Sequence, residues 1–480
     1  MIASHSAPQS RWATLRAILK QSWPVLVSSW AGMAFGVLDT AMTGHASATD
    51  LATMALSIAI YISVFIGLIG VMHALIPIQA QLFGAGEFKK IGQVWGQGLW
   101  VSLLLSVVGG LVMLFPDVWL SFSGEIAPEV RTSVHHYLWA LTFGLPAALM
   151  FRTIYGLTNA VSRPKHVMTL NLIGIALKAF LNWLLIFGNW GMPALGATGA
   201  GIASAIVFWI TLALGLWMVF RQPFYRRFHL TLGMPDFKSI GSILKLGLPM
   251  GGSYLVEVCA FTFMSLLVAQ EGIAAIGGHQ VMSNLAALAY MMPMSIGVAT
   301  AALTAQAIGA QQMYQAHRTS MMGLVVGLCG AIVTAMLLYF GREFIVAAYT
   351  NNAAVASVAL SLLVLLPFFH IVDAMQCINS YLLRAHKIAF VPMLLQMVAL
   401  MVIGLFGGWW MGFGPGKSLI EPVRNQLLAG SPVGAGSMWQ MATIGLATST
   451  VLLHCLYRIM IRKKLRVLSA PDKTLATAPA

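Results

Sequence analysis

Three acidic side chains lie inside long apolar segments that carry few or no other charges: Asp39, Glu257 and Asp373. On insertion scales, a charged side chain at the centre of a bilayer costs about 2.5–3.5 kcal/mol. Acidic residues that persist at this depth usually face the interior of a helix bundle, where they bind protons, ions or cationic ligands. We therefore expect these carboxylates to bind cations, and membrane-spanning helices should position them.

The composition of the chain excludes a soluble protein. Hydrophobic residues make up 59% of the 480 positions, charged residues make up 8%, and the mean hydropathy is +0.83. Soluble domains carry about 25% charged residues. A spanning helix needs about 20 mostly apolar residues. This rule predicts an all-α integral membrane protein with twelve spans: 22–44, 51–83, 92–115, 131–158, 166–188, 197–220, 241–270, 274–306, 317–341, 355–382, 388–412 and 436–461.

The basic residues predict how these spans are oriented. Most of the 27 lysines and arginines fall in the two tails or in alternate loops and the adjoining helix ends, with Arg152 and Arg384 among them. Few fall on the opposite side: Arg131, Arg342, Lys417 and Arg424. Because cytoplasmic loops carry the excess of Lys and Arg, we expect both termini, including a polar tail over residues 1–21, to be cytoplasmic. The net charge of +14 then reflects topology, and no nucleic acid is expected as a partner.

The two halves of the chain resemble each other. Several short matches recur in the same order and at a nearly constant offset along the chain: Lys20 to Pro24 with Lys245 to Pro249, Ala80-Gln81 and Gly84-Ala85 with Ala305-Gln306 and Gly309-Ala310, and, at a slightly smaller offset, Pro146 and Arg163 with Pro367 and Arg384. Chance similarity between apolar helices is the alternative explanation. The repeat predicts two pseudo-symmetric six-helix bundles, residues 1–220 and 241–480, joined by a cytoplasmic linker at 221–240. Parallel repeats of this kind place a substrate site between the halves and alternate access to it, which favours a transporter over a channel or a receptor.

The C-terminal half holds two of the three acids near the middle of their spans. Glu257 and Asp373 could share a pocket that binds H⁺, Na⁺ or a cationic drug, and the alternative is a pair of hydrogen-bonded structural acids. Gln280 and Asn284 share a face of the eighth span at i, i+4, and Tyr290 follows them. Their oxygen atoms could complete a Na⁺ site with the acids, or they could form hydrogen bonds between helices.

Two prolines occupy equivalent early positions in the first span of each half, Pro24 and Pro249. A proline inside a helix permits a kink, and a kink that changes with protonation would act as a gate. A static kink is the alternative. We find no phosphate-binding loop, zinc motif or nucleophile elbow, so we expect neither an enzyme nor a cofactor.

Several short stretches are together similar to the multidrug and toxic compound extrusion family, in its bacterial NorM-like branch. They are Gly36 to Gly44, Gln79 to Gly84, Leu181 to Trp183, Gly196 to Gly199, Ser253 to Glu257, Gly278 to Val281, Met292 to Ser295 and Asp373 to Gln376. The resemblance implies an antiporter, a monomer in the bacterial inner membrane among lipids, that exports cationic amphipathic drugs in exchange for Na⁺ or H⁺. It also implies functional roles for Glu257 and Asp373.

The resemblance implies a second polar pocket in the N-terminal half, built around Asp39 and Asn182, with Thr198 nearby. Lys178 precedes Asn182 by one turn on the same face, and a lysine departs from the family pattern at this position. We expect an ion pair between Asp39 and Lys178 that excludes Na⁺ from this half, with a deprotonated lysine as the alternative.

Two other functions stay open from the sequence. A flippase for lipid-linked precursors needs a cationic cavity for a pyrophosphate group, and three acids against one lysine within the spans argue against it. An intramembrane enzyme could use Glu257 and Asp373 as an acid pair, but no catalytic motif accompanies them. The loop at 413–435 is longer than the family requires, and we expect a surface insertion there with a short amphipathic helix.

Overall fold

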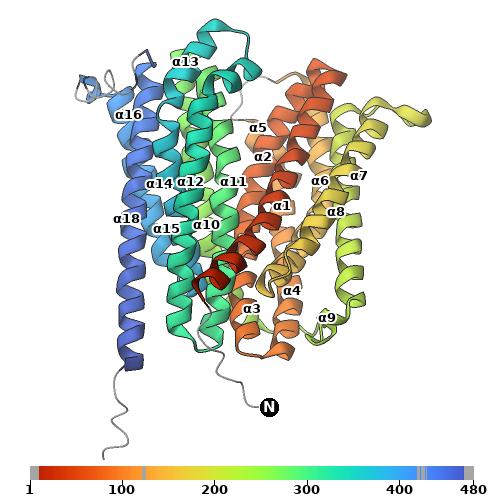
Figure 1. Ribbon diagram of the computed structural model, residues 1–480. Coiled ribbons are helices and arrows are strands. Elements are labelled where there is room, and N and C mark those ends of the chain that lie inside the picture. Colours follow the sequence, from red (N-terminus) through yellow and green to blue (C-terminus); the bar gives the residue numbers. More distant parts are fainter. Residues whose placement is uncertain (1–9, 122–125, 419–421, 423–427, 429, 470–480) are drawn as a thin grey trace, which may run out of the picture.

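The computed structural model describes residues 10–121, 126–418, 422, 428 and 430–469, and the regular structure in this part of the chain is entirely helical (Figure 1). Eleven helical stretches among these residues are long and apolar enough to cross a membrane. A further crossing is made by the pair α13 (Ala353–Leu363) and α14 (Leu366–Ala385), which bends by 53°. Counted as one span, this pair confirms the predicted twelve-helix membrane fold.

The first half of the chain forms one bundle. Its helices are α1 (Arg11–Ala46), α2 (Ala48–Met72) with its continuation α3 (Leu75–Gly84), α4 (Phe88–Leu114), the short α5 (Pro116–Leu120), α6 (Pro128–Ala160), α7 (Lys165–Phe187) and α8 (Gly196–Arg221). We call this bundle the N-lobe.

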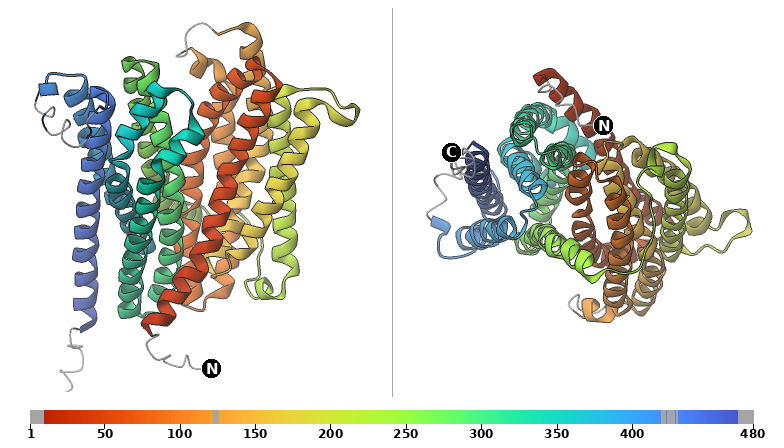
Figure 2. Two further views of the ribbon diagram at one scale, coloured as in Figure 1. Left: turned by 45° about the horizontal axis from the view of Figure 1, so that its top comes forward. Right: turned by 90° about the horizontal axis from the view of Figure 1, so that it is seen from below.

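The second half forms the C-lobe. Its helices are α10 (Phe237–Val268), α11 (Ile273–Gly309), α12 (Met313–Tyr349), the bent pair of α13 and α14, α15 (Phe390–Met397) continued by the π-helical η3 (Val398–Phe406) and α16 (Gly407–Gly412), and α18 (Val433–Ser469). The N-terminus of α1 and the C-terminus of α18 lie at the same end of the molecule (Figure 1), which we call the terminal end. Seen from that end, the two lobes lie side by side (Figure 2).

The predicted tenth span, 355–382, is the bent pair and not one straight helix. Helix α13 ends at Leu363, and Pro367 stands at the start of α14. Proline has no N–H to donate to the carbonyl four residues earlier, and its ring clashes with that carbonyl. The break therefore has a local cause, and it sets the direction of the helix that carries Asp373.

Helix α1 begins at Arg11, so the prediction of a polar tail up to residue 21 is wrong for residues 11–21. Ser10 caps the helix by accepting a hydrogen bond from the backbone N–H of Ala13 at 3.2 Å. These first turns pack against the C-lobe, where Ile18 is fully buried and Thr14 Oγ1 accepts a hydrogen bond from Gln315 of α12 at 3.4 Å. Hydropathy did not predict these first turns of α1, because the hydrogen bonds of a helix are made within its own backbone and a helix can therefore extend beyond its apolar segment.

The linker between the lobes is held against α4. It comprises α9 (Pro223–Arg226) and the chain up to Asp236. Gln97 of α4 donates to the carbonyl of Met234 and accepts from the backbone N–H of Asp236, both at 2.8 Å. Asp236 caps α10, and hydrogen bonds from the Ser239 side chain and from two backbone N–H groups lower the pKa of its carboxyl group.

The two lobes touch at the terminal end, where α3 crosses α11. A Cβ atom added to Gly84 would lie 1.9 Å from the carbonyl oxygen of Gln306, and one added to Gly309 would lie 1.9 Å from that of Gln81. The repeated glycine motifs of the two halves thus meet each other across an approximate two-fold axis. Only glycine permits backbones to approach this closely.

Reciprocal hydrogen bonds surround this crossing. Gln81 Nε2 donates to the carbonyl of Ala385 at the end of α14, at 2.8 Å. Gln306 Nε2 donates to the carbonyl of Ala160 at the end of α6, at 2.6 Å. The two acceptors are related by the same offset along the chain as the two donors, so each lobe holds the other through the same contact.

This geometry corrects one detail of the predicted repeat. Ser162 and Lys387 follow α6 and α14 with φ of 61° and 60°, and their backbone N–H groups bond the carbonyls of Asn159 and Arg384. The ends of α6 and α14 are therefore equivalent at the same separation along the chain as Gly84 and Gly309. The slightly smaller separation expected from the match of Pro146 with Pro367 does not apply here. The counterpart of Arg384 is Asn159, and its expected match with Arg163 is wrong.

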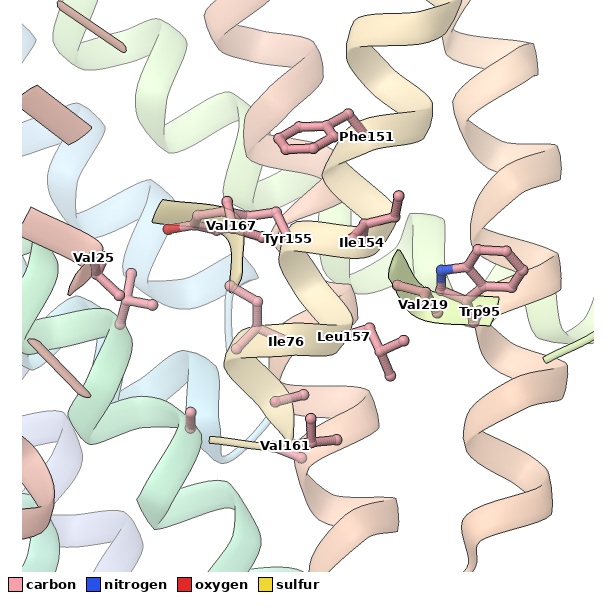
Figure 3. Close-up of a cluster of buried hydrophobic side chains, with 14 of the residues drawn as sticks. Val25, Ile76, Trp95, Phe151, Ile154, Tyr155, Leu157, Val161, Val167 and Val219 are labelled. Atoms are coloured by element: carbon pink, nitrogen blue, oxygen red, sulfur yellow. The ribbon is translucent and has the colours of Figure 1, made fainter. Parts of the chain in front are cut away.

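A buried apolar cluster continues from one lobe into the other. Figure 3 shows its N-lobe part, in which Val219 of α8 lies beside Trp95 of α4, and Tyr155 extends from the other side of α6. The same cluster includes Ala305 of α11 and Tyr381 of α14. The lobes thus share a packed core near the terminal end, and the polar sites are built around it.

Candidate functional site

Asp39 lies in the N-lobe at a junction of α1, α7 and α8. Its side chain is 5% exposed. Its Oδ1 atom accepts a hydrogen bond from Asn182 Nδ2 at 2.7 Å and lies 2.8 Å from Lys178 Nζ. The structure therefore brings together the acid, the amide and the lysine that were expected to form one pocket.

Lys178 has no solvent exposure, and its ammonium group is fully engaged. Besides Asp39, it donates to the carbonyl of Ala200 at 2.9 Å and to Ser204 Oγ on α8. These contacts use all three ammonium protons. A buried ion pair with its remaining donors satisfied offsets part of its desolvation penalty, and the Asp39 pocket already contains a cation.

Thr198, predicted to be part of this pocket, forms no hydrogen bond with it in the described residues. Ala200 and Ser204 are four residues apart and share one face of α8, whereas Thr198 lies two residues before Ala200 and points elsewhere. Ser204 was not among the predicted site residues. Its i, i+4 spacing from Ala200, among the small residues at the start of α8, was the signal that could have identified it.

Glu257 and Asp373 lie on α10 and α14, where an aromatic contact joins the two helices. The rings of Phe261 and Phe369 meet edge to face with centroids 6.2 Å apart. Phe261 follows Glu257 by one turn, and Phe369 precedes Asp373 by one turn. Because α10 and α14 run in opposite directions, this contact places both acids on the same side of the aromatic pair.

A second contact joins these helices nearer the terminal end. The hydroxyl oxygens of Tyr254 and Tyr381 lie 2.7 Å apart. Tyr254 precedes Glu257 by three residues, and Tyr381 follows Asp373 by eight. The two carboxylates thus lie at the levels between the phenylalanine and tyrosine contacts, within electrostatic range of each other.

Neither carboxylate has a basic partner. In the part of the chain that the structure describes, no lysine, arginine or histidine lies within 4.0 Å of Glu257 or Asp373, and neither side chain makes a hydrogen bond. Asp373 is nevertheless 5% exposed, and Glu257 is half-buried. Their free oxygen atoms are suited to a proton, a Na⁺ ion or an organic cation.

The other polar residues predicted for this pocket differ in how they are placed. Tyr290 is half-buried and lies within electrostatic range of Glu257. Gln280 and Asn284 bond each other on one face of α11, with Nε2 and Oδ1 at 3.0 Å, and both are exposed. No hydrogen bond joins these two amides to either acid among the described residues.

The two predicted gating prolines lie inside continuous helices. Pro24 falls in α1 and Pro249 in α10. Ser253 Oγ donates to the carbonyl of Pro249 at 3.1 Å. A movable kink at these positions stays a prediction.

Two arginines that the sequence grouped with the cytoplasmic loops and helix ends instead face the interior. Arg384 is 5% exposed, and its Nη1 donates to Tyr254 Oη at 3.0 Å. Arg152 is half-buried, with its guanidinium 5.5 Å from the centroid of Tyr155. Their position near helix ends concealed them, because hydropathy does not report which side of a helix a residue occupies. Residues 419–421, 423–427 and 429 of the 413–435 loop lie outside the described residues, and the short amphipathic helix expected in this loop stays a prediction.

Comparisons with known proteins give a consistent result. The MatE family model matches residues 24–184 and 249–410, one match in each lobe. The chain is 37% identical over 462 residues to a probable multidrug resistance protein NorM of Aromatoleum aromaticum, covering 95% of this chain and 97% of the relative. It is 33% identical over 449 residues to a multidrug resistance protein NorM of Vibrio vulnificus, covering 92% and 95%. Among solved structures, the eukaryotic MATE transporter AtDTX14 is similar in fold, with a TM-score of 0.83, 18% identity, and 94% and 98% of the two chains covered.

Proposed function

Since this chain belongs to the MatE family and is a multidrug efflux transporter that crosses the membrane many times, we propose that it is an antiporter. It exports organic cations in exchange for inward Na⁺ or H⁺. Its location is the bacterial inner membrane, and it acts as a monomer. The terminal end, which carries most of the basic residues, faces the cytoplasm by the positive-inside rule.

The observation that carries this proposal is the pair of unpartnered carboxylates in the C-lobe. Glu257 and Asp373 are ionisable groups placed within spans, with no basic side chain of the described chain within 4.0 Å, although Arg384 lies within electrostatic range of Glu257. An acid in this setting gains free energy by binding any available cation. A coupling ion and a cationic drug therefore compete for the same oxygen atoms, and competition at one site is sufficient for exchange.

The proposed cycle follows from that competition. With the terminal end closed by the crossing of Gly84 and Gly309, the site receives Na⁺ or H⁺ from outside, and the drug leaves. The ion drives the change to the inward-open state only if it binds the two states with different affinity. Inside, the ion leaves and another drug cation binds.

The N-lobe pocket has a different role in this proposal. Lys178 already neutralises Asp39, and a like charge repels Na⁺ from the site. Lys178→Asn should therefore create a Na⁺ site and change the Na⁺ and pH profiles of efflux. Profiles that match those of the wild type would contradict this assignment.

The direct test uses purified transporter in proteoliposomes loaded with a fluorescent organic cation such as ethidium. Dye movement is measured first with an imposed Na⁺ gradient at constant pH, and then with a pH gradient in Na⁺-free buffer. We expect one gradient, or both, to drive uphill dye movement. Movement that neither gradient accelerates over protein-free vesicles would refute antiport.

A further inference from the structure

A buried histidine on α11 joins that helix to α10 and α18, on the side of the two C-lobe acids that is farther from the terminal end. His279 has no solvent exposure. Its Nδ1 atom accepts a hydrogen bond from the indole Nε1 of Trp439 on α18 at 3.1 Å. Its Nε2 atom lies 2.8 Å from Ser265 Oγ on α10. Both ring nitrogens are therefore engaged inside the protein.

The chemistry of the donors fixes the direction of each hydrogen bond in this group. The indole N–H of Trp439 can only donate, so Nδ1 of His279 is the acceptor and the proton of the neutral ring lies on Nε2. Nε2 then donates to Ser265 Oγ, with Ser283 Oγ at 3.3 Å as a weaker second acceptor. The Ser265 hydroxyl donates to the backbone carbonyl of Phe261 at 3.0 Å. We call this directional series, from α18 through α11 to the backbone of α10, the tryptophan–histidine chain.

The tryptophan–histidine chain begins and ends beside the turns that carry the two acids. Phe261, at its end, follows Glu257 by one turn of α10. The ring of Trp439, at its beginning, packs against Phe369 with centroids 5.0 Å apart and against Phe261 at 5.9 Å. Phe369 precedes Asp373 by one turn of α14. The chain and its aromatic contacts thus hold α10 and α14 together at the level of the acids.

The N-lobe shows that the fold itself does not require this histidine. At the offset of the glycine crossing, the counterpart of His279 is Met54, which is fully buried in α2. The counterpart of Ser265 is Thr40, whose Oγ1 donates to the carbonyl of Gly36 at 3.0 Å. This lobe keeps the last link of the chain, but a methionine cannot join it to a neighbouring helix. Among the described residues, the complete chain occurs in the lobe that carries the unpaired acids.

We propose that His279 is a positioning residue for ion coupling, which acts through the tryptophan–histidine chain to set the separation at which Glu257 and Asp373 bind one cation together. A binding site is effective when its ligands are held near the productive geometry before the ion arrives. Hydrogen bonds in series also polarise and strengthen one another in a buried setting. This inference rests on the proposed function, in which these acids bind the coupling ion.

The test measures the affinity for the driving ion separately from the maximal rate. Ethidium movement in proteoliposomes is recorded against the concentration of that ion, either Na⁺ at constant pH or H⁺ in Na⁺-free buffer. Trp439→Phe keeps an aromatic ring but removes the donor, and it should raise the half-saturating ion concentration about tenfold. The maximal rate should stay within about twofold. Ser265→Ala, which breaks the chain on the other side of the histidine, should shift the ion affinity in the same direction.

A matched control is available in the N-lobe. The indole of Trp209 on α8 donates to the carbonyl of Phe143 at 3.1 Å at an exposed position. Trp209→Phe makes the same chemical change as Trp439→Phe but is remote from the acids. It should leave the half-saturating ion concentration unchanged.

Variants of the histidine test whether it acts together with the indole. His279→Phe leaves the indole N–H buried without a partner, and it should weaken ion affinity at least as much as Trp439→Phe. His279→Asn offers an amide oxygen in place of Nδ1 and should restore part of the affinity. His279→Phe combined with Trp439→Phe should be no worse than His279→Phe alone, because both changes act on one hydrogen bond.

Two results would overturn the positioning role. One is an unchanged half-saturating ion concentration in both Trp439→Phe and Ser265→Ala, and these small changes decide the question even where the His279 variants do not fold. The other is a lower apparent Tm and a lower maximal rate with unchanged ion affinity, since the chain would then only stabilise the fold. Wild-type ethidium movement that no ion gradient drives would instead refute the antiport proposal itself.

Discussion

The N-lobe and the C-lobe both bury carboxylates, but only the N-lobe supplies a basic partner. Asp39 lies 2.8 Å from Lys178 and receives a second hydrogen bond from Asn182. Glu257 and Asp373 have no such neighbour among the described residues. In the N-lobe the charges of the acid and the lysine neutralise each other, whereas the two unpaired acids of the C-lobe can be neutralised by an external cation. The comparison supports the proposal that the C-lobe exchanges a mobile cation, whereas the N-lobe carries a fixed one.

The lobes remain alike where they touch. At the crossing, a Cβ atom added to Gly84 or to Gly309 would lie 1.9 Å from a backbone carbonyl oxygen of the opposite lobe. Gln81 and Gln306 donate hydrogen bonds to equivalent backbone carbonyls. The internal repeat is thus retained at the contact between the lobes and lost at the polar sites. A symmetric contact would allow the lobes to rock about a shared axis, and under the proposed antiport the asymmetric sites would determine which lobe responds to the ion.

The largest expected effect comes from removing the fixed cation of the N-lobe. Lys178→Met leaves Asp39 buried without its partner, which should destabilise the protein by roughly 3–5 kcal/mol. The double variant Asp39→Asn with Lys178→Met removes both charges and should recover most of this loss. Apparent Tm in detergent measures both, and Lys245→Met, at an exposed lysine, is the control. A double variant as unstable as the single one would show that the two side chains do not form a functional pair.

Neutralising the free acids of the C-lobe should act on transport more than on stability. Glu257→Gln and Asp373→Asn should each reduce gradient-driven efflux by about 100-fold, equivalent to roughly 2.7 kcal/mol, because the ion loses its ligand. The Asp39→Asn and Lys178→Met double variant should reduce efflux at least tenfold less. Initial efflux rates at equal protein density decide this comparison. An N-lobe double variant as inactive as Glu257→Gln would place ion coupling in both lobes.

The symmetric contact predicts matched effects in the two lobes. Gly84→Ala and Gly309→Ala each force a backbone apart, and overpacking of this kind costs about 1–3 kcal/mol. Both should lower apparent Tm by similar amounts and slow efflux, since the terminal end can no longer close fully. Gly241→Ala, where an added Cβ meets no atom within 4 Å, is the control, and alanine there should be neutral or slightly stabilising. Clearly unequal losses at the two crossing positions would contradict the two-fold geometry.

Much of this architecture could be predicted from the sequence because its causes are local or periodic. Span positions follow from apolar length, and the two similar bundles follow from the repeated Gln81 and Gln306 motifs, although the sequence did not predict that these motifs cross. The partnership of Lys178 and Asn182 follows from their i, i+4 spacing. Asp39 is far from Lys178 along the chain, and its approach to that face was expected only from family resemblance.

The errors concern which side of a helix a residue occupies and where a helix ends. Arg384 was grouped with the cytoplasmic loops and helix ends because a basic residue near the end of a span usually reaches water, yet α14 turns it toward Tyr254. Thr198 was included with the pocket that the family resemblance implies, although it forms no hydrogen bond with Asp39 in the described residues. Residues 11–21 were assigned to a tail because their polarity conceals the burial of Ile18 against the C-lobe. Each depends on a contact between helices, which a single sequence does not specify.

The smallest expected effect concerns the acidic side chains that cap helices at the end opposite the termini, where the two lobes differ. There the Asp50 carboxylate accepts one hydrogen bond from the first turn of α8, donated by the backbone N–H of Ala197 at 2.7 Å. Glu271 accepts two from the start of α18, at Gly434 and Ala435, at 2.6 and 2.7 Å. Losing an acidic contact to a helix N-terminus costs about 1 kcal/mol. Asp50 also accepts a hydrogen bond from the exposed Ser47 hydroxyl at 2.6 Å. Because Glu271 engages two backbone N–H groups of a helix start and Asp50 only one, Glu271→Ala should lower apparent Tm more than Asp50→Ala, while both retain efflux within about twofold, or roughly 0.4 kcal/mol. Equal shifts in Tm would mean that the second backbone hydrogen bond of Glu271 stabilises the protein no more than the Ser47 hydrogen bond of Asp50 does, and would contradict the expected difference between the lobes at this end.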